Sequence, residues 1–283
     1  MEERRIAVET VDLVHDYPAR TNASTGQKAV VRALNGVNLK IYENDKLSII
    51  GQNGSGKTTI VRHFNGLLRP TEGSVYLFGE DTKDKAVGEM ARRCGYVFQN
   101  PNHQIFCTKV YEELEVGPRN FGFSEEEIKS RVEEVVEMMN LRDILDKHPM
   151  TLDYTTKKIV TIASVLVFAP EILILDEPTG GLDEVGRRML TKIINMMHEN
   201  GHTVIMISHD MDYVAENSDR IVVMTKGNVI ADGTPKEIFL MDDVLKQAMI
   251  APPQITSLDI ELDGKGNTAL SVGDFVRKYG DHK

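Results

Sequence analysis

Cysteine is scarce in this chain. The 283 residues include two cysteines, Cys94 and Cys107, and their spacing is not that of a metal-binding cluster. Two isolated thiols in such a chain are expected to stay reduced. The sequence therefore predicts neither a disulfide-stabilised fold nor a cysteine-based metal site.

Basic charge is also in short supply. Lysine and arginine number 33 against 43 aspartates and glutamates, which gives a net charge of −10, and the sequence contains no long basic run. A nucleic-acid-binding protein needs a positive face for the phosphates, and direct docking on anionic lipid needs one as well. We therefore expect no nucleic-acid partner and no direct electrostatic binding to lipid.

Long apolar runs are missing too. The longest candidate, residues 159–169, contains Thr161 and Ser164 and falls short of the ~20 apolar residues that span a bilayer. The opening residues, MEERR, lack the apolar stretch of a signal peptide. Any attachment to a membrane is therefore expected to come through partner proteins.

What the sequence does contain is a complete P-loop. Residues 51–58 read GQNGSGKT, between a strand-like apolar run over residues 47–50 and a helix predicted over residues 58–68. In such a loop, successive backbone N–H groups and the helix N-terminus face phosphate oxygens. Lys57 is expected to reach the β- and γ-phosphates, and the Thr58 hydroxyl to bind Mg²⁺. The predicted nucleotide contacts are Gly51, Asn53, Gly54, Ser55, Gly56, Lys57, Thr58 and Thr59.

A second segment ends in two adjacent carboxylates. Residues 171–175 read EILIL and are followed by Asp176 and Glu177. A buried parallel strand has this pattern, and ligands of open α/β sheets lie at the carboxyl ends of the strands. Asp176 is expected to hold Mg²⁺, directly or through a water, and Glu177 to orient or deprotonate the water that attacks the γ-phosphate.

Further short motifs follow in order along the chain. YVFQNP over residues 96–101 places Gln99 after a strand, IMISHD over residues 205–210 places His209 after another, and GGLD over residues 180–183 lies between them. Together with the P-loop, they resemble the nucleotide-binding subunits of ABC transporters over residues 5–240. The resemblance implies that Tyr17 stacks on adenine and that Gln99 senses Mg²⁺ and the γ-phosphate. It also implies that His209 contacts the γ-phosphate and that Asp183 belongs to the D-loop.

The resemblance implies an α/β P-loop NTPase fold with a RecA-like core. Residues 5–50 have a β-rich pattern, interrupted by a polar loop over residues 20–28, and are expected to form an antiparallel β part. Between residues 100 and 170 the pattern is helical, with a capping box at Ser124 and Glu127 and an apolar helical face after it. We expect an ABC ATP-binding domain over residues 1–245, with an inserted helical subdomain, and a small C-terminal extension over residues 246–283.

The signature motif departs from the family pattern. Where the family has LSGGQ, this chain has LDYTT over residues 152–156. In the family, the signature motif of each subunit faces the γ-phosphate that the partner subunit holds. Asp153 is a good helix N-cap, but its carboxylate also adds negative charge near that phosphate. We therefore expect a heterodimer with a second ABC ATPase that carries an intact signature motif.

The C-terminal part of the sequence indicates which group of ABC ATPases the chain resembles. A helix is predicted over residues 235–249, then APPQI over residues 251–255, a polar segment, and a short helix over residues 272–278. This tail and the stretches over residues 97–106 and 115–120 are similar to the ATPases of energy-coupling factor (ECF) transporters, which import vitamins and nickel or cobalt ions. The resemblance implies that the extension is a dimerisation element. It also implies a transmembrane scaffold subunit that docks near residues 99–121 and a separate substrate-binding membrane subunit.

The predicted function is therefore ATP hydrolysis, with ATP and Mg²⁺ as cofactors, at the cytoplasmic face of the cell membrane in an ECF-type importer. The catalytic residues are expected to be Glu177, His209 and Gln99, and the metal site to comprise Thr58, Asp176 and Gln99. Two alternatives stay open. One is a soluble ABC ATPase without a transport role, and the other is a regulatory module that binds ATP and hydrolyses little of it.

Overall fold

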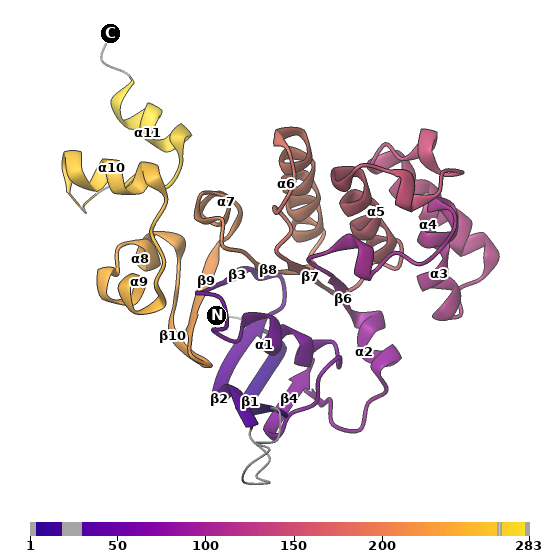
Figure 1. Ribbon diagram of the computed structural model, residues 1–283, viewed down its shortest axis with the longest axis horizontal. Helices are drawn as coiled ribbons and strands as arrows, with labels where there is room; N and C mark the ends of the chain where they lie inside the picture. The colour runs from indigo at the N-terminus through magenta and orange to yellow at the C-terminus, as the bar shows by residue number, and fades with distance from the viewer. Residues whose placement is uncertain (1–3, 19–29, 265, 267, 281–283) are drawn as a thin grey trace, which may run out of the picture.

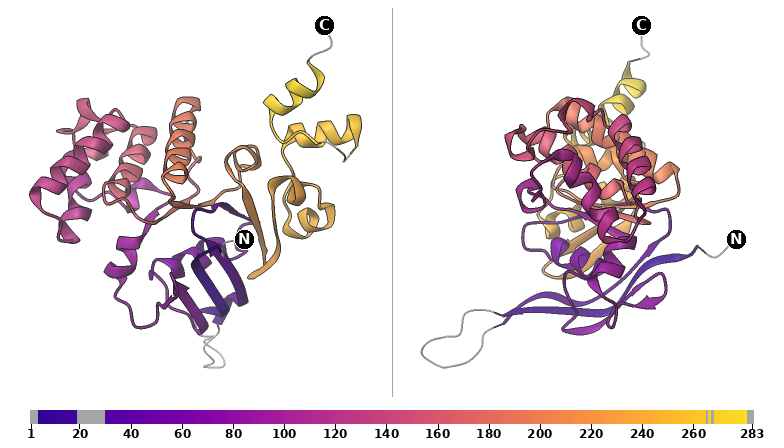
Figure 2. Two further views of the ribbon diagram at one scale, coloured as in Figure 1. Left: turned by 180° about the vertical axis from the view of Figure 1, so that it is seen from behind. Right: turned by 90° about the vertical axis from the view of Figure 1, so that its right-hand side faces the viewer.

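A computed structural model describes residues 4–18, 30–264, 266 and 268–280 of the chain. The polar loop expected over residues 20–28 lies outside the described residues. Figure 1 shows the chain arranged around a central sheet. The helices between residues 100 and 170 lie at one edge of that sheet, and the C-terminal helices lie at the other (Figures 1 and 2).

Among the described residues, the central sheet has the strand order β10-β9-β3-β8-β7-β6. Its parallel strands are β3 (Lys46–Ile50), β6 (Cys94–Val97), β7 (Ile172–Asp176), β8 (Thr203–Ile207) and β9 (Arg220–Thr225), and β10 (Asn228–Gly233) pairs antiparallel with β9. Strands β6, β7 and β8 are buried at every residue, which explains their nearly continuous apolar sequence. The predicted α/β fold is confirmed.

The two faces of this sheet belong to separate hydrophobic cores. Leu173 and Leu175 of β7 pack in the core that includes α5 (Tyr154–Leu166), α6 (Glu184–Glu199) and α7 (Met211–Asn217). Ile172 and Ile174 of the same strand pack in the core that includes α1 (Lys57–Phe64) and the N-terminal strands. Because side chains alternate along a strand, a single apolar strand supplies both cores.

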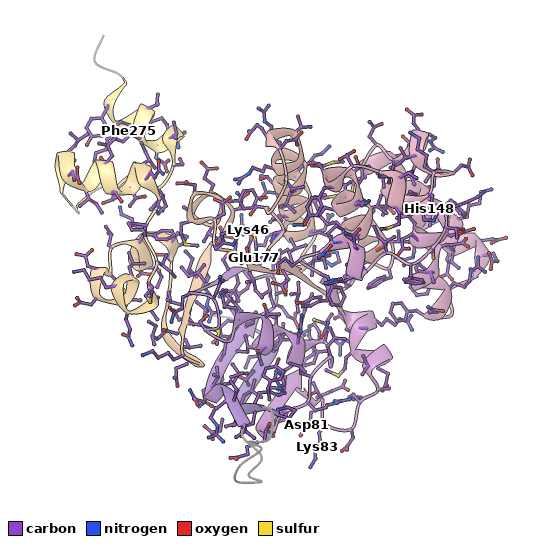
Figure 3. All side chains as sticks on the ribbon, in the orientation of Figure 1. Lys46, Asp81, Lys83, His148, Glu177 and Phe275 are labelled. Atoms are coloured by element: carbon purple, nitrogen blue, oxygen red, sulfur yellow. The ribbon has the colours of Figure 1, made fainter. Side chains whose placement is uncertain are left out.

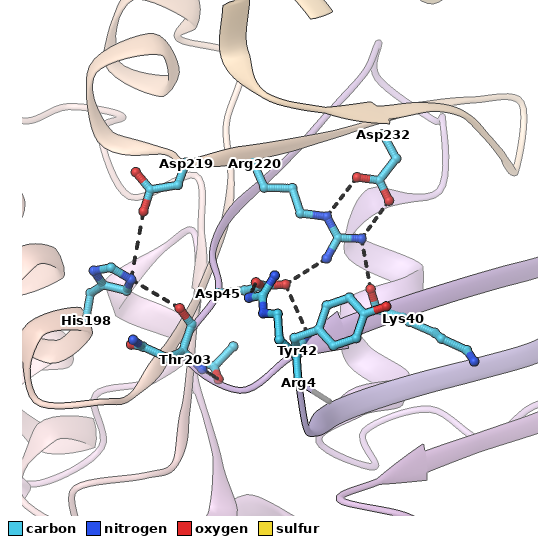
Figure 4. A network of polar contacts seen from close by, with 10 residues as sticks. Arg4, Lys40, Tyr42, Asp45, His198, Thr203, Asp219, Arg220 and Asp232 are labelled. Carbon is cyan, nitrogen blue, oxygen red and sulfur yellow. Dashed lines mark hydrogen bonds and ion pairs between the residues drawn. The ribbon is translucent and has the colours of Figure 1, made fainter. Parts of the chain in front are cut away.

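The N-terminal strands β1 and β2 pair antiparallel, as predicted, in a sheet of order β2-β1-β4-β5. The strand order and the two later strands of this sheet were not predicted. Its members are β1 (Ile6–Pro18), β2 (Val30–Tyr42), β4 (Glu72–Leu77) and β5 (Glu80–Asp81). Arg220 of β9 joins this sheet to the central one (Figure 4). Its guanidinium donates to Asp45 at 2.7 Å, to Asp232 at 2.6 Å and to the Lys40 carbonyl at 2.9 Å. One partly buried arginine therefore ties β2, the turn before β3, and β10 together.

The region between residues 100 and 170 contains α3 (Val110–Asn120), α4 (Glu125–Met138), α5 and the short 3₁₀ turns Pro101–His103, Arg142–Ile144 and Pro149–Thr151. The capping box predicted at Ser124 and Glu127 begins α4. The apolar face after it is buried, as expected, and comprises Ile128, Val132, Val135, Val136 and Met139. Helix α2 (Val87–Arg93) precedes β6. No helix within the described ranges is long and apolar enough to cross a membrane.

Two predicted helices differ from the structure. Helix α1 ends at Phe64 rather than at residue 68, because Gly66 turns the chain with a positive φ of 77°. The helix predicted over residues 235–249 is two helices, α8 (Pro235–Phe239) and α9 (Asp242–Ala248). The backbone N–H groups of Leu240 and Met241 bond to the carbonyls of Glu237 and Ile238, which closes a tight turn between the two helices.

The C-terminal extension contains a helix that the sequence analysis missed, α10 (Gln254–Asp263), in addition to α11 (Val272–Tyr279), which begins where predicted. Asp259 of α10 is fully buried. Its carboxylate accepts hydrogen bonds from Lys278 at 2.9 Å, Tyr279 at 2.7 Å and the backbone N–H of Ala269 at 2.6 Å. The centre of the extension is thus polar, and for this reason its sequence resembled a loop.

Candidate nucleotide site

The P-loop connects β3 to α1, and its backbone geometry requires glycine. A Cβ atom at Gly51 would lie 2.2 Å from the Met224 carbonyl oxygen, and one at Gly56 would lie 2.9 Å from the Ala33 carbonyl oxygen. Gly56 also has a φ of 106°, in the region that other residues rarely adopt. The loop is therefore packed closely against its own chain on one side.

Lys57 lies under the loop that precedes it. Its side chain is buried, and Nζ donates to the carbonyl oxygens of Gly51 at 2.7 Å and Gln52 at 3.0 Å. Burial lowers the pKa of this ammonium, and the nearby Glu177 and Asp176 carboxylates partly offset that effect. The ammonium group is therefore held by two backbone oxygens, and its charge is stabilised by the two nearby carboxylates.

Asp176 ends β7 beside the P-loop helix. One carboxylate oxygen accepts from the Tyr96 hydroxyl at 2.6 Å, and the other lies 3.5 Å from the Thr58 hydroxyl. The fold thus brings together Thr58 and Asp176, which were predicted to share a metal ion. Tyr96 was not predicted, and its contact with Asp176 depends on β6 pairing beside β7.

Glu177 has an unusual backbone conformation and a buried carboxylate. Its φ is 49°, in the left-handed region that costs a residue other than glycine roughly 1–3 kcal/mol. The carboxylate accepts from His209 Nδ1 at 2.7 Å and from the His209 backbone N–H at 3.3 Å. Burial raises the pKa of Glu177, and the His209 contact partly offsets this rise. The side chain of His209 is 70% exposed, so its ring remains accessible.

A cavity of about 760 Å³ opens at the carboxyl ends of the strands. Figure 3 shows Glu177 near the middle of the molecule, between the helical region that carries His148 and the extension that carries Phe275. All of the predicted P-loop contacts line the cavity, together with Gln99, Asp176, Glu177 and His209. Gln52, Met211, Asp212 and residues 249–254 line it as well and were not predicted.

Two predicted contacts do not line this cavity. The Tyr17 hydroxyl lies 3.3 Å from the Thr59 hydroxyl, and its ring packs edge-on against His15. Asp183 is the N-cap of α6, where it accepts from the Gly186 backbone N–H at 2.8 Å. The adenine-stacking role of Tyr17 and the D-loop role of Asp183 both stay predictions.

The residues present fit a nucleoside triphosphate with Mg²⁺. Ser55 Oγ is buried and, among the described residues, has no hydrogen-bond partner. The loop adds backbone N–H groups and a lysine, and the Thr58 and Asp176 oxygens are the ligand type that Mg²⁺ prefers. Phosphate binding and a metal-bound hydroxyl–carboxylate pair are therefore both compatible with this side of the cavity.

The model of the ABC transporter family matches residues 34–180, which contain the P-loop and the paired carboxylates. The chain belongs to the ABC transporter family. It is therefore an ATP-binding and ATP-hydrolysing protein. An ABC transporter ATP-binding protein of Caldanaerobacter subterraneus subsp. tengcongensis is 41% identical over 245 residues, which cover 87% of this chain and 42% of that protein.

A second relative, the ECF transporter ATP-binding protein EcfA of Methanocaldococcus jannaschii, is 37% identical over 268 residues, covering 94% of this chain and 92% of the relative. This ABC ATPase therefore belongs with the ECF transporter ATP-binding proteins. A solved structure of cbiO1 from Clostridium perfringens, described as part of the ABC transporter complex cbiONQ, has a TM-score of 0.71 and 34% identity. It covers 86% of this chain, which in turn covers 94% of it.

The unusual signature segment of this ABC ATPase, residues 152–156, contacts its own chain. Asp153 caps α5 as predicted, accepting from the Thr156 backbone N–H at 2.9 Å. The Thr156 hydroxyl also donates to Asp153. This hydrogen bond and, after it, the one from the Thr156 backbone lower the pKa of Asp153, so the carboxylate is ionised at neutral pH. The Tyr154 hydroxyl lies 3.5 Å from the Gln99 carbonyl, and the Thr155 hydroxyl lies 3.4 Å from the Gly181 carbonyl.

Proposed function

We propose that this chain is the ATPase subunit of an ECF-type importer for vitamins or transition-metal ions. The similarity to the M. jannaschii ECF protein supports this proposal because it extends over 268 of the 283 residues. An alignment of that length necessarily includes part of residues 246–283, outside the ATP-binding domain that we predict. In this arrangement the contacts with the solute belong to a different polypeptide.

We assign ATP binding to the P-loop side of the cavity. Lys57 is already surrounded by oxygens, and a triphosphate would replace the Gly51 and Gln52 carbonyls as its partner. Thr58, Asp176 and Gln99 would hold Mg²⁺, which neutralises charge on the phosphates when bound. Stacking of Tyr17 on adenine would complete the binding of the nucleotide.

Hydrolysis is assigned to Glu177 with His209. A buried carboxylate with a raised pKa is a better base than an ordinary glutamate because its pKa is closer to the working pH. His209 lies close enough to orient this carboxylate, and its exposed ring leaves a nitrogen for the γ-phosphate. ATP binding would close the dimer, and hydrolysis would reopen it and move the membrane subunits.

We further propose that the dimer is asymmetric. A second ABC ATPase with an intact LSGGQ motif would complete the ATP site of this chain. The ATP of that partner would face Asp153, Tyr154 and Thr155 and would turn over slowly. The ionised Asp153 supports this assignment, because it would add negative charge beside a triphosphate.

Attachment to the cytoplasmic face of the membrane would come through partners. Phe106 lies within the segment 99–121 that we expect to contact the scaffold subunit, and it is 71% exposed. Aromatic side chains are enriched in the cores of protein interfaces, so an exposed Phe106 is available for such a contact. The extension would hold the two ATPases together through exposed apolar side chains on α10 and α11, namely Leu258, Leu262, Val272 and Val276.

The test is affinity purification of this chain in mild detergent from its native membranes. We expect to recover a second ABC ATPase with an intact signature motif and a polytopic membrane protein. Recovery from the soluble fraction alone, or as a homodimer, would overturn the importer and the asymmetric pair while leaving the ATP chemistry in place.

A matched pair of variants sharpens this experiment. Phe106→Ala should reduce recovery of the membrane protein and leave the second ATPase bound. Met150→Ala removes another exposed apolar side chain of the helical region, outside residues 99–121, and should change neither. Equal recovery of the membrane protein with both variants would count against docking at Phe106.

A further inference from the structure

Lys158 is a buried cation that the proposed mechanism leaves without a role. It lies on α5, two residues after the signature segment, and its side chain is fully buried. Nζ donates to the carbonyl oxygens of Glu177 at 2.7 Å and Gly180 at 3.0 Å. An apolar residue of similar size would fill this space without the cost of burying an ammonium group. What a lysine adds here is a pair of hydrogen bonds to the backbone on either side of the turn after Glu177.

The hydrogen bond from Lys158 to the Glu177 carbonyl constrains the backbone of Glu177, which is the residue with the strained conformation. The Glu177 backbone N–H is held by the Ile207 carbonyl at 2.9 Å, and its carbonyl is held by Lys158. These two groups belong to the peptide planes on either side of the Glu177 Cα, and the orientation of those planes defines φ and ψ. A residue at a φ of 49° keeps that conformation only where its surroundings determine it. Lys158 fixes one of the two planes.

The hydrogen bond from Lys158 to the Gly180 carbonyl lies in the D-loop, residues 180–183, where other side chains of α5 also make contact. A Cβ atom at Gly181 would lie 2.6 Å from the Tyr154 ring, and one at Gly186 would lie 3.0 Å from the Thr155 methyl group. The Lys158 ammonium also lies 5.8 Å from the centre of the Tyr154 ring. Three side chains from the start of α5 therefore pack on the segment that leads from Glu177 to α6.

We propose that Lys158 is a positioning residue that holds the Glu177 backbone in its catalytic conformation and couples the start of α5 to the hydrolytic site of the same subunit. The inference rests on the proposed role of Glu177. Lys158 does not itself line the cavity, and its hydrogen bond to a lining residue is to the backbone carbonyl of Glu177. Lys158 therefore acts on turnover through Glu177 and not on nucleotide binding. Burial lowers the pKa of this lysine to about 8, and the Glu177 and Asp176 charges oppose that effect.

The test compares Lys158→Met with Lys157→Met in the purified transporter complex. Lys157 is the neighbouring, partly exposed lysine of the same helix. The readouts are kcat for ATP hydrolysis and the Kd for the fluorescent analogue mant-ATP, with circular dichroism to check folding. For Lys158→Met we expect kcat to fall by tenfold or more while Kd stays within twofold of wild type. Lys157→Met should change neither value.

A second variant keeps the test decisive if Lys158→Met does not fold. Lys158→Gln has an amide that can donate to one of the two carbonyls, so its kcat should lie several-fold below wild type with an unchanged Kd. A kcat within twofold of wild type in either folded variant would overturn the inference, as would an equal loss of turnover and binding. Glu177→Gln is measured alongside: if that variant keeps full turnover, the proposed catalytic role of Glu177 fails, whatever Lys158 does.

Discussion

The P-loop and the start of α5 each place a buried lysine beside the carboxylates of Asp176 and Glu177, but the two segments differ in whether they line the cavity. Lys57 donates to the Gly51 and Gln52 carbonyls, and Lys158 donates to the Glu177 and Gly180 carbonyls, at similar distances. The P-loop residues line the cavity, whereas Tyr154, Thr155 and Lys158 pack on their own chain. One lysine is placed to exchange its partners for a ligand, and the other is placed to keep them.

In the asymmetric dimer that we propose, this chain has two unequal surfaces for nucleotide. The P-loop side has the glycines that allow close backbone approach. The signature segment, residues 152–156, has a charged side chain and two bulky ones where the family motif has serine and glycines. The two bulky side chains, Tyr154 and Thr155, contact the Gln99 and Gly181 carbonyls of the same subunit. The four tests that follow separate the two surfaces, beginning with the largest expected effect.

Glu177→Gln should abolish most of the turnover at the P-loop side. A positioned base contributes roughly 10²- to 10⁴-fold to a reaction, so kcat should fall by about that factor while the Kd for mant-ATP stays within twofold. Glu184→Gln is the matched control, because Glu184 is an exposed acid at the start of α6 that pairs with Arg188. Undiminished hydrolysis in Glu177→Gln would remove the assignment of the base.

Lys57→Met should act on binding first. Hydrogen bonds to charged groups contribute about 1.5–3 kcal/mol, which corresponds to roughly 10- to 100-fold weaker binding of mant-ATP. Lys83→Met, at an exposed site far from the cavity, serves as the control. If Lys57→Met bound the analogue as wild type does, Lys57 would not be the phosphate ligand.

Replacing the signature side chains should raise turnover at the second site. In the heterodimer, the combined variant Asp153→Ser, Tyr154→Gly and Thr155→Gly is expected to hydrolyse ATP roughly three- to tenfold faster. That gain matches the ~1 kcal/mol typical of an exposed charge interaction. The single change Asp153→Ser keeps an N-cap residue and isolates the contribution of charge. An ATPase rate that both variants leave unaltered would make the departure from LSGGQ irrelevant.

The smallest effect is expected in the pH profile. Because burial raises the pKa of Glu177, its carboxylate is protonated at a higher pH than that of an ordinary glutamic acid. As the pH falls, kcat/KM should therefore decline earlier than for an exposed glutamate. His209 holds this pKa down through its charge and its hydrogen bonds, so His209→Ala should move the acid limb to higher pH. A limb that stays in place would show that Glu177 does not control it. Measuring the Kd for mant-ATP over the same pH range separates binding from chemistry.

Local sequence patterns predicted those features of the fold and the site that depend on a single segment of the chain. The P-loop glycines, the strand before Asp176 and the capping box at Ser124 are all readable within a few residues, and the structure has each of them. The cavity residues Gln99, Asp176 and His209 were also found, since each ends or follows a buried strand of the same sheet. The carboxyl ends of neighbouring parallel strands meet at one edge.

The remaining features depend on contacts between distant segments. Lys158 could be recognised in the sequence only as a lysine at the beginning of an apolar helical run, and its partners lie about 20 residues further along the chain. Helix α10 was missed because it contains Thr256 and Asp259, polar residues that are common in loops. In the structure both face inward, where Thr256 bonds to the Ala269 carbonyl and Asp259 to Lys278. Sequence spacing gives no information about such pairings until the fold is known.

One feature of the extension connects it to the nucleotide. Residues 249–254, which lead from α9 into α10, form part of the wall of the cavity that contains the P-loop and Glu177. A ligand whose affinity depends on this linker must, by thermodynamic reciprocity, change the free energy of holding the linker in place by the same amount. Occupancy of the cavity and the docking of the extension are then two measurements of a single coupling free energy, and each can be determined by titrating the other.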